Sequence, residues 1–211
     1  PAQGWAGPEQ TRVFPMNTTI RTPGADDAGP LEQADKEAAA QAARHRHHPV
    51  VKAVGTLSEV ADQVPLSLVC GSVILGGALS GQDHVARTGL RMMAAHVLAN
   101  SVKRVIKNRF RRTRPVEMIK RQDYRCEPGE SRGGHETSFP SGHTAGAVAV
   151  AVVVARDLPH MAVPALGVAA MIAGIQVPRG KHYPGDVAAG AVLGLVSALV
   201  VRRLWDRAAR D

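Results

Sequence analysis

The sequence predicts an all-α protein, a compact helical bundle of about five transmembrane helices that follows a disordered N-terminal tail. Long runs of the chain lack Lys, Arg, Asp and Glu, and the polar stretches are concentrated in residues 1–48 and 104–142. At 211 residues the chain has room for one domain and a tail, since a domain typically spans roughly 100–200 residues. We therefore divide the chain into a polar tail, 1–48, and a membrane-embedded domain, 49–211.

The tail is rich in Pro, Gly, Asp, Gln and Ala, a composition that buries little apolar surface and therefore favours disorder. Only a short patch, Glu37 to Ala43, is helix-prone. The tail ends in the run Arg44-His45-Arg46-His47-His48. These histidines could bind a metal, but no Cys or carboxylate is spaced to fix one. We interpret the run as a solvated basic stretch near a membrane surface.

Five stretches are candidates for membrane-spanning helices. The clearest lies between Asp62 and Asp83, where twenty residues carry no formal charge. At about 1.5 Å per residue, this length matches a hydrocarbon thickness of ~30 Å. Residues 88–103 are interrupted by Arg91 and His96, which a helix inside a bundle can keep on its protein-facing side. The other candidate spans are 137–155, 161–178 and 187–201.

Small residues recur throughout these spans, with Gly76, Ala147 and Gly194 as examples. They let helices approach closely in lipid, where packing drives association, and this favours a compact bundle. Ala-rich helices of similar length also occur in soluble all-helical cores, so a soluble bundle is the alternative. The lengths of the uncharged stretches favour the membrane.

The net charge of +8 is compatible with nucleic-acid binding. However, only 3% of the residues are aromatic, so the stacking platforms that bind bases are scarce. The basic residues cluster in loops that flank the apolar segments. We therefore expect a membrane with anionic lipid as the partner, and no nucleic acid.

The first motif is Lys107 and Arg114, which are seven residues apart. On a helix that continued from the second span, two turns would place both side chains on one face before the next residue, a proline. A Lys ammonium and a forked Arg guanidinium can neutralise the oxygens of a transferring phosphoryl group. The alternative is a basic run beside anionic lipid, since Arg109, Arg111 and Arg112 share the stretch.

The second motif, Pro140-Ser141-Gly142-His143, immediately precedes a long apolar run and so predicts a helix start. Ser141 is a capping candidate, and the free backbone N–H groups of such an end bind anions. Gly142 allows the backbone to approach phosphate oxygens closely, while His143 can hold a proton for a leaving alkoxide. The alternative is a histidine that merely lies at a membrane interface.

The third motif is His182-Tyr183-Pro184-Gly185-Asp186, in which the proline and glycine predict a turn or helix start. The Asp186 carboxylate can then reach one imidazole nitrogen and fix the tautomer of His182. The other nitrogen becomes a competent nucleophile for phosphorus and would form a phosphohistidine that water hydrolyses. The alternative is a turn histidine with Asp186 as a helix cap.

In this order and spacing, and with Ser138-Phe139 leading into the second, the three motifs resemble the signature of the type 2 phosphatidic acid phosphatase (PAP2) superfamily. That superfamily also includes bacterial isoprenyl-diphosphate phosphatases, glucose-6-phosphatase and vanadium haloperoxidases. The resemblance covers roughly residues 50–204. It implies that His182 is the nucleophile, that Asp186 orients it and that His143 is the general acid. The implied phosphate-binding residues are Lys107, Arg114, Ser141 and Gly142.

The third motif departs from the family pattern, which has Ser-Arg where this chain has Ile175 and Gln176. One phosphate-binding Arg is therefore missing. Arg179, about one helical turn further on, could deliver a guanidinium to the same place, although Pro178 disfavours a continuous helix there. Loss of one charged phosphate contact would cost ~1.5–3 kcal/mol, which weakens activity roughly ten- to a hundredfold.

The sequence therefore predicts a metal-independent phosphatase that acts on a lipid phosphate or diphosphate, such as phosphatidic acid, phosphatidylglycerol phosphate or a polyprenyl diphosphate. No metal or other cofactor is expected, because no carboxylates with magnesium-like or zinc-like spacing accompany the motifs. Bacterial members of the family imply an inner-membrane protein with the site on the periplasmic face. The alternatives are a non-catalytic relative that binds anionic lipid and a vanadium-dependent haloperoxidase.

Overall fold

The structure, a computed structural model, describes residues 29–130 and 134–210 and is mostly helical. The α-helices of these residues are α1 (Pro30–Ala43), α2 (Pro49–Leu57), α3 (Gln63–Leu79), α4 (Asp83–Arg109), α5 (Pro115–Arg121), α6 (Gly142–Asp157), α7 (Ala162–Ile175) and α8 (Pro184–Ala208). The short elements are the 3-10 helices η1 (Ser58–Ala61), η2 (Gly134–Glu136) and η3 (Pro159–Met161) and the strands β1 (Phe110–Arg112) and β2 (Cys126–Pro128).

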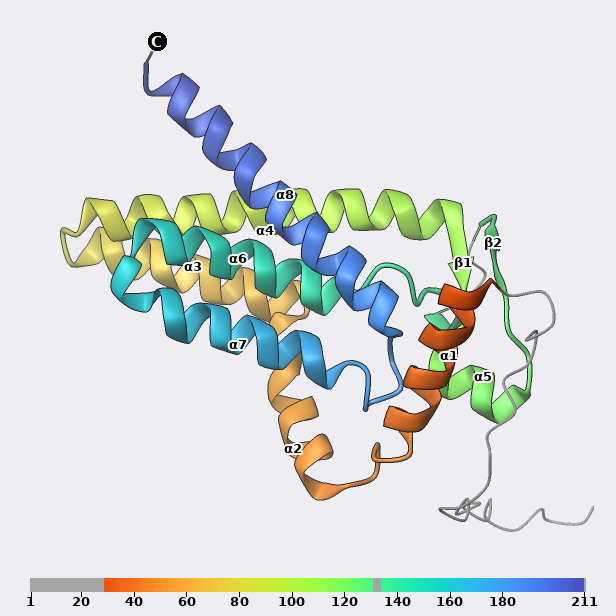
Figure 1. Cartoon of the computed structure of the whole chain (residues 1–211). Helices are drawn as coiled ribbons and strands as arrows, with labels where there is room; N and C mark the ends of the chain where they lie inside the picture. The colour runs from red at the N-terminus through yellow and green to blue at the C-terminus, as the bar shows by residue number, and fades with distance from the viewer. Residues whose placement is uncertain (1–28, 131–133, 211) are drawn as a thin grey trace, which may run out of the picture.

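Five helices, α3, α4, α6, α7 and α8, form the bundle (Figure 1). Helix α4 packs against α3, α6 and α8, and α6 packs in addition against α7. Each of the five predicted spans falls largely on one of these helices. Helices α1 and α5 and the two strands gather at one end of the bundle, on the right in Figure 1.

Glycines of α8 let this helix lie directly on α6. A Cβ atom added at Gly190 would lie 2.5 Å from the backbone oxygen of Ser141, and one added at Gly194 would lie 2.5 Å from that of Ala145. The two glycines are four residues apart, so they occupy one face of α8. This backbone contact is the close approach that the small residues predict, and it fixes the start of α8 beside the start of α6.

Composition supports fewer membrane spans than there are bundle helices. Among the described residues, α8 alone is long and apolar enough to cross a membrane by itself. A second candidate arises if α2 with η1 and α3, which meet at a 61° bend, count as one broken span. Composition thus supports one or two spans rather than five. Helices α3, α6 and α7 have 17, 16 and 14 residues, and α4 carries charged residues near both ends.

Part of the predicted disordered tail is a helix. Residues 30–43 form α1, which contacts α5 and α8, so the prediction of disorder is wrong there. The reason is an alanine stripe: Ala39, Ala40 and Ala43 are buried and pack in one cluster with Met118 and Tyr183. The helix-prone patch that ends at Ala43 lies within α1. Residues 1–28 lie outside the described residues.

The predicted continuation of the second span through Arg114 is also wrong. Helix α4 ends at Arg109, and the next three residues form β1, which pairs antiparallel with β2 in the register Phe110↔Pro128. Strand pairing with a segment sixteen residues away overrides the helical spacing of Lys107 and Arg114. The small sheet is a local exception to the all-α prediction, and it redirects the chain across the end of the bundle.

Candidate active site

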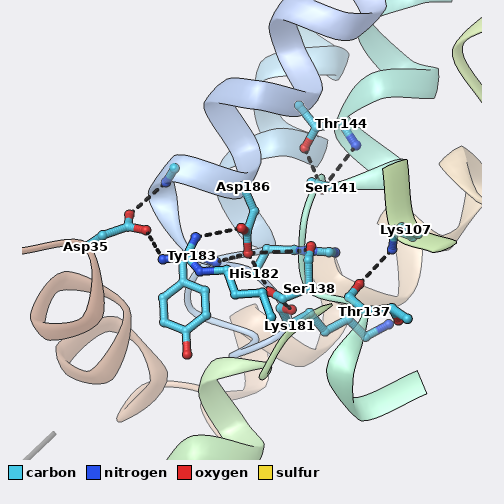
Figure 2. Close-up of polar contacts among 12 residues, drawn as sticks. Asp35, Lys107, Thr137, Ser138, Ser141, Thr144, Lys181, His182, Tyr183 and Asp186 are labelled. Carbon is cyan, nitrogen blue, oxygen red and sulfur yellow. Dashed lines mark hydrogen bonds and ion pairs between the residues drawn. The ribbon is translucent and has the colours of Figure 1, made fainter. Parts of the chain in front are cut away.

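The three predicted motifs meet at one end of the bundle, at the C-terminal end of α4 and the N-terminal ends of α6 and α8 (Figure 2). Two hydrogen bonds join the segments. The backbone N–H of Ser141 donates to the Asp186 carbonyl at 3.0 Å, which ties the second motif to the third. Lys107 Nζ donates to the carbonyl of Thr137 at 2.7 Å, which ties the first motif to the loop before the second.

His182 is buried in the loop before α8, and its Nδ1 lies 2.7 Å from the backbone oxygen of Ser138. A carbonyl oxygen only accepts, so Nδ1 carries the proton and Nε2 carries the lone pair. Burial, reinforced by the charges of Lys107 and Arg114 and opposed by Asp186, lowers the pKa of His182 to about 4. The imidazole is therefore neutral at physiological pH and has a free nucleophilic nitrogen.

Asp186 is fully buried but contacts His182 only at a distance: its Oδ2 lies 3.8 Å from Nδ1, beyond a hydrogen bond. The carboxylate instead accepts hydrogen bonds from the Ser138 hydroxyl and, at 2.9 Å, from the backbone N–H of Tyr183. Because Ser138 also holds Nδ1 through its carbonyl, Asp186 can orient the imidazole through Ser138. The predicted orienting role of Asp186 would therefore act through Ser138 and not through a direct hydrogen bond to His182.

Arg112 is the main site residue that sequence reasoning missed. Its Nη1 donates to Asp186 Oδ1 and its Nη2 to Asp35 Oδ2, both at 2.7 Å, while the guanidinium stacks on the Tyr183 ring at 4.0 Å. Asp35 belongs to α1 and also accepts a hydrogen bond from the backbone N–H of Gly185 at 2.7 Å. Through Asp35, helix α1 is therefore joined to Arg112 of β1 and to Gly185 in the segment that carries His182.

The sequence offered no periodic signal for Arg112, because one arginine within a basic run resembles its neighbours. Its role depends on β1, which directs this side chain into the site instead of along a helix face. Strand formation also relocates Arg114, which precedes α5 as its N-cap residue. Arg114 Nε is buried and has no hydrogen-bond partner among the described residues. The phosphate-binding role of Arg114 stays a prediction, and a donor without a partner is compatible with it.

The second motif begins α6 as predicted, with Ser141 as the N-cap residue. The Ser141 hydroxyl accepts hydrogen bonds from Thr144 Oγ1 at 2.9 Å and from the Thr144 N–H at 3.5 Å. A Cβ atom at Gly142 would lie 2.9 Å from Cδ and 3.2 Å from Nζ of Lys103. Lys103 lies one helical turn before Lys107, so α4 supplies two ammonium groups near the start of α6. The sequence analysis did not single out Lys103.

His143 pairs with a carboxylate that the sequence analysis also missed: Nε2 lies 3.2 Å from Oε2 of Glu59, in η1. Glu59 additionally accepts hydrogen bonds from Arg179 Nη2 and, at 2.9 Å, from Lys181 Nζ. Burial alone would raise the pKa of Glu59, but the hydrogen bonds from Lys181, Arg179 and His143 lower it to about 2. Glu59 is thus a carboxylate anion that links His143 to two cations.

Arg179 and Gln176, the residue at the position of the missing family arginine, contact the same hydroxyl group. Gln176, at that position, is fully buried, and its Nε2 donates to Ser58 Oγ at 3.3 Å. Arg179 Nη1 donates to the same hydroxyl at 2.8 Å. The guanidinium of Arg179 and the amide of Gln176 therefore converge on one atom. Helix α7 ends at Ile175, so Arg179 lies in the loop that follows it. The continuous helix that Pro178 disfavours is therefore absent.

No group of three or more His, Cys, Asp or Glu side chains that could hold a metal ion occurs within residues 29–130 and 134–210. In the histidine run between α1 and α2, His48 caps α2 by accepting from the Val50 N–H at 3.3 Å. Arg46 Nε donates to His47 Nε2 at 3.0 Å. The run therefore has local structural contacts of its own.

Comparison with known families agrees with the motif geometry. The sequence model of the PAP2 superfamily matches residues 88–210, which include all three motifs and more than half of the chain. The chain belongs to the PAP2 superfamily. Helix α1, η1 and α3 lie outside the matched residues, so the contacts of Asp35 and Glu59 add to the shared signature.

A solved PAP2 structure has a similar fold. It is the crystal structure of a transmembrane PAP2-type phosphatidylglycerolphosphate phosphatase from Bacillus subtilis. The two chains share 19% sequence identity with a TM-score of 0.58, over 87% of this chain and 90% of the Bacillus chain. A search of curated proteins gave no match. At this identity the similarity shows the fold, which places the PAP2 site of this chain on the same kind of helical bundle.

Proposed function

We propose that this PAP2 protein is a metal-independent phosphatase of the bacterial inner membrane that hydrolyses a lipid phosphate or diphosphate. The observation that carries the proposal is His182, a buried neutral imidazole with its lone pair on Nε2. Lys107 and Arg114 lie near enough to influence its pKa. A nucleophile beside two cations suits attack on a phosphoryl group.

In the proposed reaction, Nε2 of His182 attacks phosphorus, and the bond between phosphorus and the lipid oxygen breaks. His143 donates a proton to the departing alkoxide, which leaves as the lipid alcohol. Water then attacks the phosphohistidine, His143 takes up the proton of that water, and inorganic phosphate leaves. The residues proposed to hold the phosphoryl oxygens are Lys107, Arg114, Ser141, Gly142 and Arg179.

A lipid substrate is favoured by the apolar surface of the bundle. Large hydrophobic side chains on its helices are exposed, including Leu68, Leu75, Val163, Leu166, Val192 and Leu195. In water such a surface would be unfavourable, whereas in a bilayer it faces acyl chains. We therefore propose that all five bundle helices lie in the membrane. Phosphatidylglycerol phosphate joins phosphatidic acid and polyprenyl diphosphates as a candidate because of the Bacillus protein's named activity.

Arg179 is proposed to replace the missing family arginine, because it converges with Gln176 on the Ser58 hydroxyl. The site then retains its full complement of cationic phosphate ligands. This favours catalysis over the alternative of a non-catalytic protein that only binds anionic lipid. The site is proposed to face the periplasm, as the resemblance to the family's bacterial members implies.

The test is phosphate release in detergent from phosphatidic acid, phosphatidylglycerol phosphate and a polyprenyl diphosphate, with excess chelator present. We expect hydrolysis of at least one lipid, inhibition by vanadate, and loss of hydrolysis in His182→Ala. The matched control is His160→Ala, since His160 is an exposed histidine in η3, after the C-terminal end of α6. Purified protein that releases no phosphate above the His182→Ala background would favour the lipid-binding alternative.

A further inference from the structure

Glu59 lies in η1, between α2 and α3, outside the three motifs and outside the matched residues 88–210. Its Oε2 lies 3.2 Å from Nε2 of His143. Its Oε1 accepts hydrogen bonds from Lys181 and Arg179. Both carboxylate oxygens are therefore held, one by the imidazole and the other by two cations, so that the carboxylate has a defined orientation toward His143.

The segment that carries Glu59 is itself anchored. The hydroxyl of the neighbouring residue, Ser58, is buried, donates to the carbonyl of Gly55 at 2.7 Å and accepts from Arg179 at 2.8 Å. A Cβ atom at Gly55 would lie 2.9 Å from Arg179 Nε, so the guanidinium lies directly against α2. Glu59 therefore has a fixed place relative to α6.

We propose that Glu59 is a positioning residue for His143 and that the pair supplies the proton of the reaction. This inference rests on the phosphatase function proposed above. The Nε2–H of the imidazolium donates to Glu59, whose negative charge stabilises the charged ring. Nδ1 of His143 has no hydrogen-bond partner among the described residues, so it is the nitrogen left for a substrate oxygen.

The proton balance of this arrangement is simple. The imidazolium of His143 releases the Nδ1 proton to the lipid alkoxide as the bond to phosphorus breaks, and the ring becomes neutral. The Nε2–H group of His143 stays hydrogen-bonded to Glu59 throughout the cycle. Nδ1 then accepts a proton from the water that attacks the phosphohistidine at His182, which restores the imidazolium for the next cycle.

Glu59 is the only carboxylate among the described residues that hydrogen-bonds His143. The other charged groups around the ring are Asp62 at the start of α3, Lys181 before α8, Arg179 through Glu59, and Lys103 of α4 beside Gly142. Three of these four groups are cations. Without Glu59, the imidazole would face mainly positive charge, and its protonated form would lose its strongest support.

The catalytic test compares Glu59→Gln with Asp62→Asn on two substrates, phosphatidic acid in detergent micelles and p-nitrophenyl phosphate. The alkoxide of phosphatidic acid needs a proton to leave, whereas p-nitrophenolate does not. Glu59→Gln is expected to lower kcat about tenfold or more on phosphatidic acid and at most about twofold on p-nitrophenyl phosphate. Asp62→Asn, which keeps the Glu59 contact, is expected to change this substrate ratio little.

The substrate ratio does not depend on how much of a variant is folded, so partial misfolding cannot imitate the expected result. The basic limb of the kcat profile is also expected to move to lower pH in Glu59→Gln. Equal losses on both substrates, with an unchanged profile, would overturn the inference.

A second measurement needs no activity: the titration of His143 followed by NMR with ¹³C-histidine, its signal assigned from His143→Gln. The midpoint is expected about one pH unit lower in Glu59→Gln than in the unmodified protein, with a smaller change in Asp62→Asn. An unchanged midpoint would overturn the inference. If the unmodified protein hydrolyses no substrate, the proposed function fails, while a shifted midpoint would still support the Glu59–His143 pair.

Discussion

His182 and His143 lie at the starts of neighbouring helices, yet their surroundings differ. The ring of His182 is buried, and its Nδ1 meets an uncharged backbone carbonyl at 2.7 Å. The ring of His143 is partly exposed, and its Nε2 meets the Glu59 carboxylate at 3.2 Å. Burial lowers the pKa of both imidazoles, but at His143 the hydrogen bond to the Glu59 carboxylate opposes this shift and favours the imidazolium. One residue type thereby suits attack at one position and proton donation at the other.

The largest expected effects come from removing each imidazole ring and varying the leaving group of the substrate. His182→Ala is expected to lose about 10⁴-fold or more in kcat on every substrate, because the nucleophile is gone. His143→Ala is expected to lose roughly 10²–10⁴-fold on phosphatidic acid and much less on p-nitrophenyl phosphate, which needs no proton donor. Steady-state kinetics on both substrates checks this. A loss in His143→Ala that is independent of the leaving group would remove the distinction.

The ion pair between Arg112 and Asp186, next to His182, can be tested by measuring the free energy of unfolding. Arg112→Met leaves the buried Asp186 carboxylate without its ion-pair partner, and loss of such a partner typically costs ~3–5 kcal/mol in the free energy of unfolding. Arg111→Met is the matched control, because its pair with Glu127 is half-exposed and should contribute below about 1 kcal/mol. Chemical denaturation in detergent measures both. Equal effects would show that the Arg112 pair does not anchor the site.

The contribution of Arg179 is expected to be smaller. Arg179→Ala removes the guanidinium that we propose replaces the missing family arginine, and kcat/KM should fall roughly ten- to a hundredfold. The control is Arg121→Ala on α5, which only forms an exposed pair with Glu117. Kinetics on the best lipid substrate measures the difference. An unchanged kcat/KM in Arg179→Ala would show that Gln176 is not compensated from this position.

A further prediction concerns the pH dependence of stability. The pKa of His182 is about 4 in the folded protein against an ordinary value of 6.5. Between these values the unfolded chain binds more protons at this residue, so stability falls as pH decreases from about 6.5 to 4. His182→Ala should show a weaker decline over that window than the unmodified protein. Identical declines would contradict the burial of a neutral imidazole.

The parts of the fold that could be predicted from the sequence are those with long apolar runs. Uncharged runs locate the bundle helices because a helix in lipid or in a bundle core must exclude charge over most of its length. Strand β1 escaped prediction because it pairs with β2, a partner whose identity depends on tertiary contacts. Helix α1 was partly hidden by the composition of residues 1–48, in which alanines are diluted by polar and turn-forming residues.

Likewise, only part of the site could be recognised from the sequence. The three motifs are short and local, so their order along the chain could be compared directly with a family signature. Arg112, Glu59 and Asp35 act through contacts with residues 74, 84 and 150 positions away, and no local spacing encodes such pairs. The indirect path from Asp186 through Ser138 depends on the same kind of contact. To predict this path, one would need the position of the Ser138 backbone carbonyl, which the sequence does not give.

The most direct test of the central claim is to trap the covalent intermediate. The protein is mixed with a ³²P-labelled lipid phosphate, quenched in alkali after milliseconds, and examined for a phosphohistidine, which survives alkali and is lost in acid. The account predicts label on the peptide that contains His182 and none in His182→Ala, with normal labelling in His160→Ala. Phosphate release by the unmodified protein with no alkali-stable label, or with label retained in His182→Ala, would contradict it.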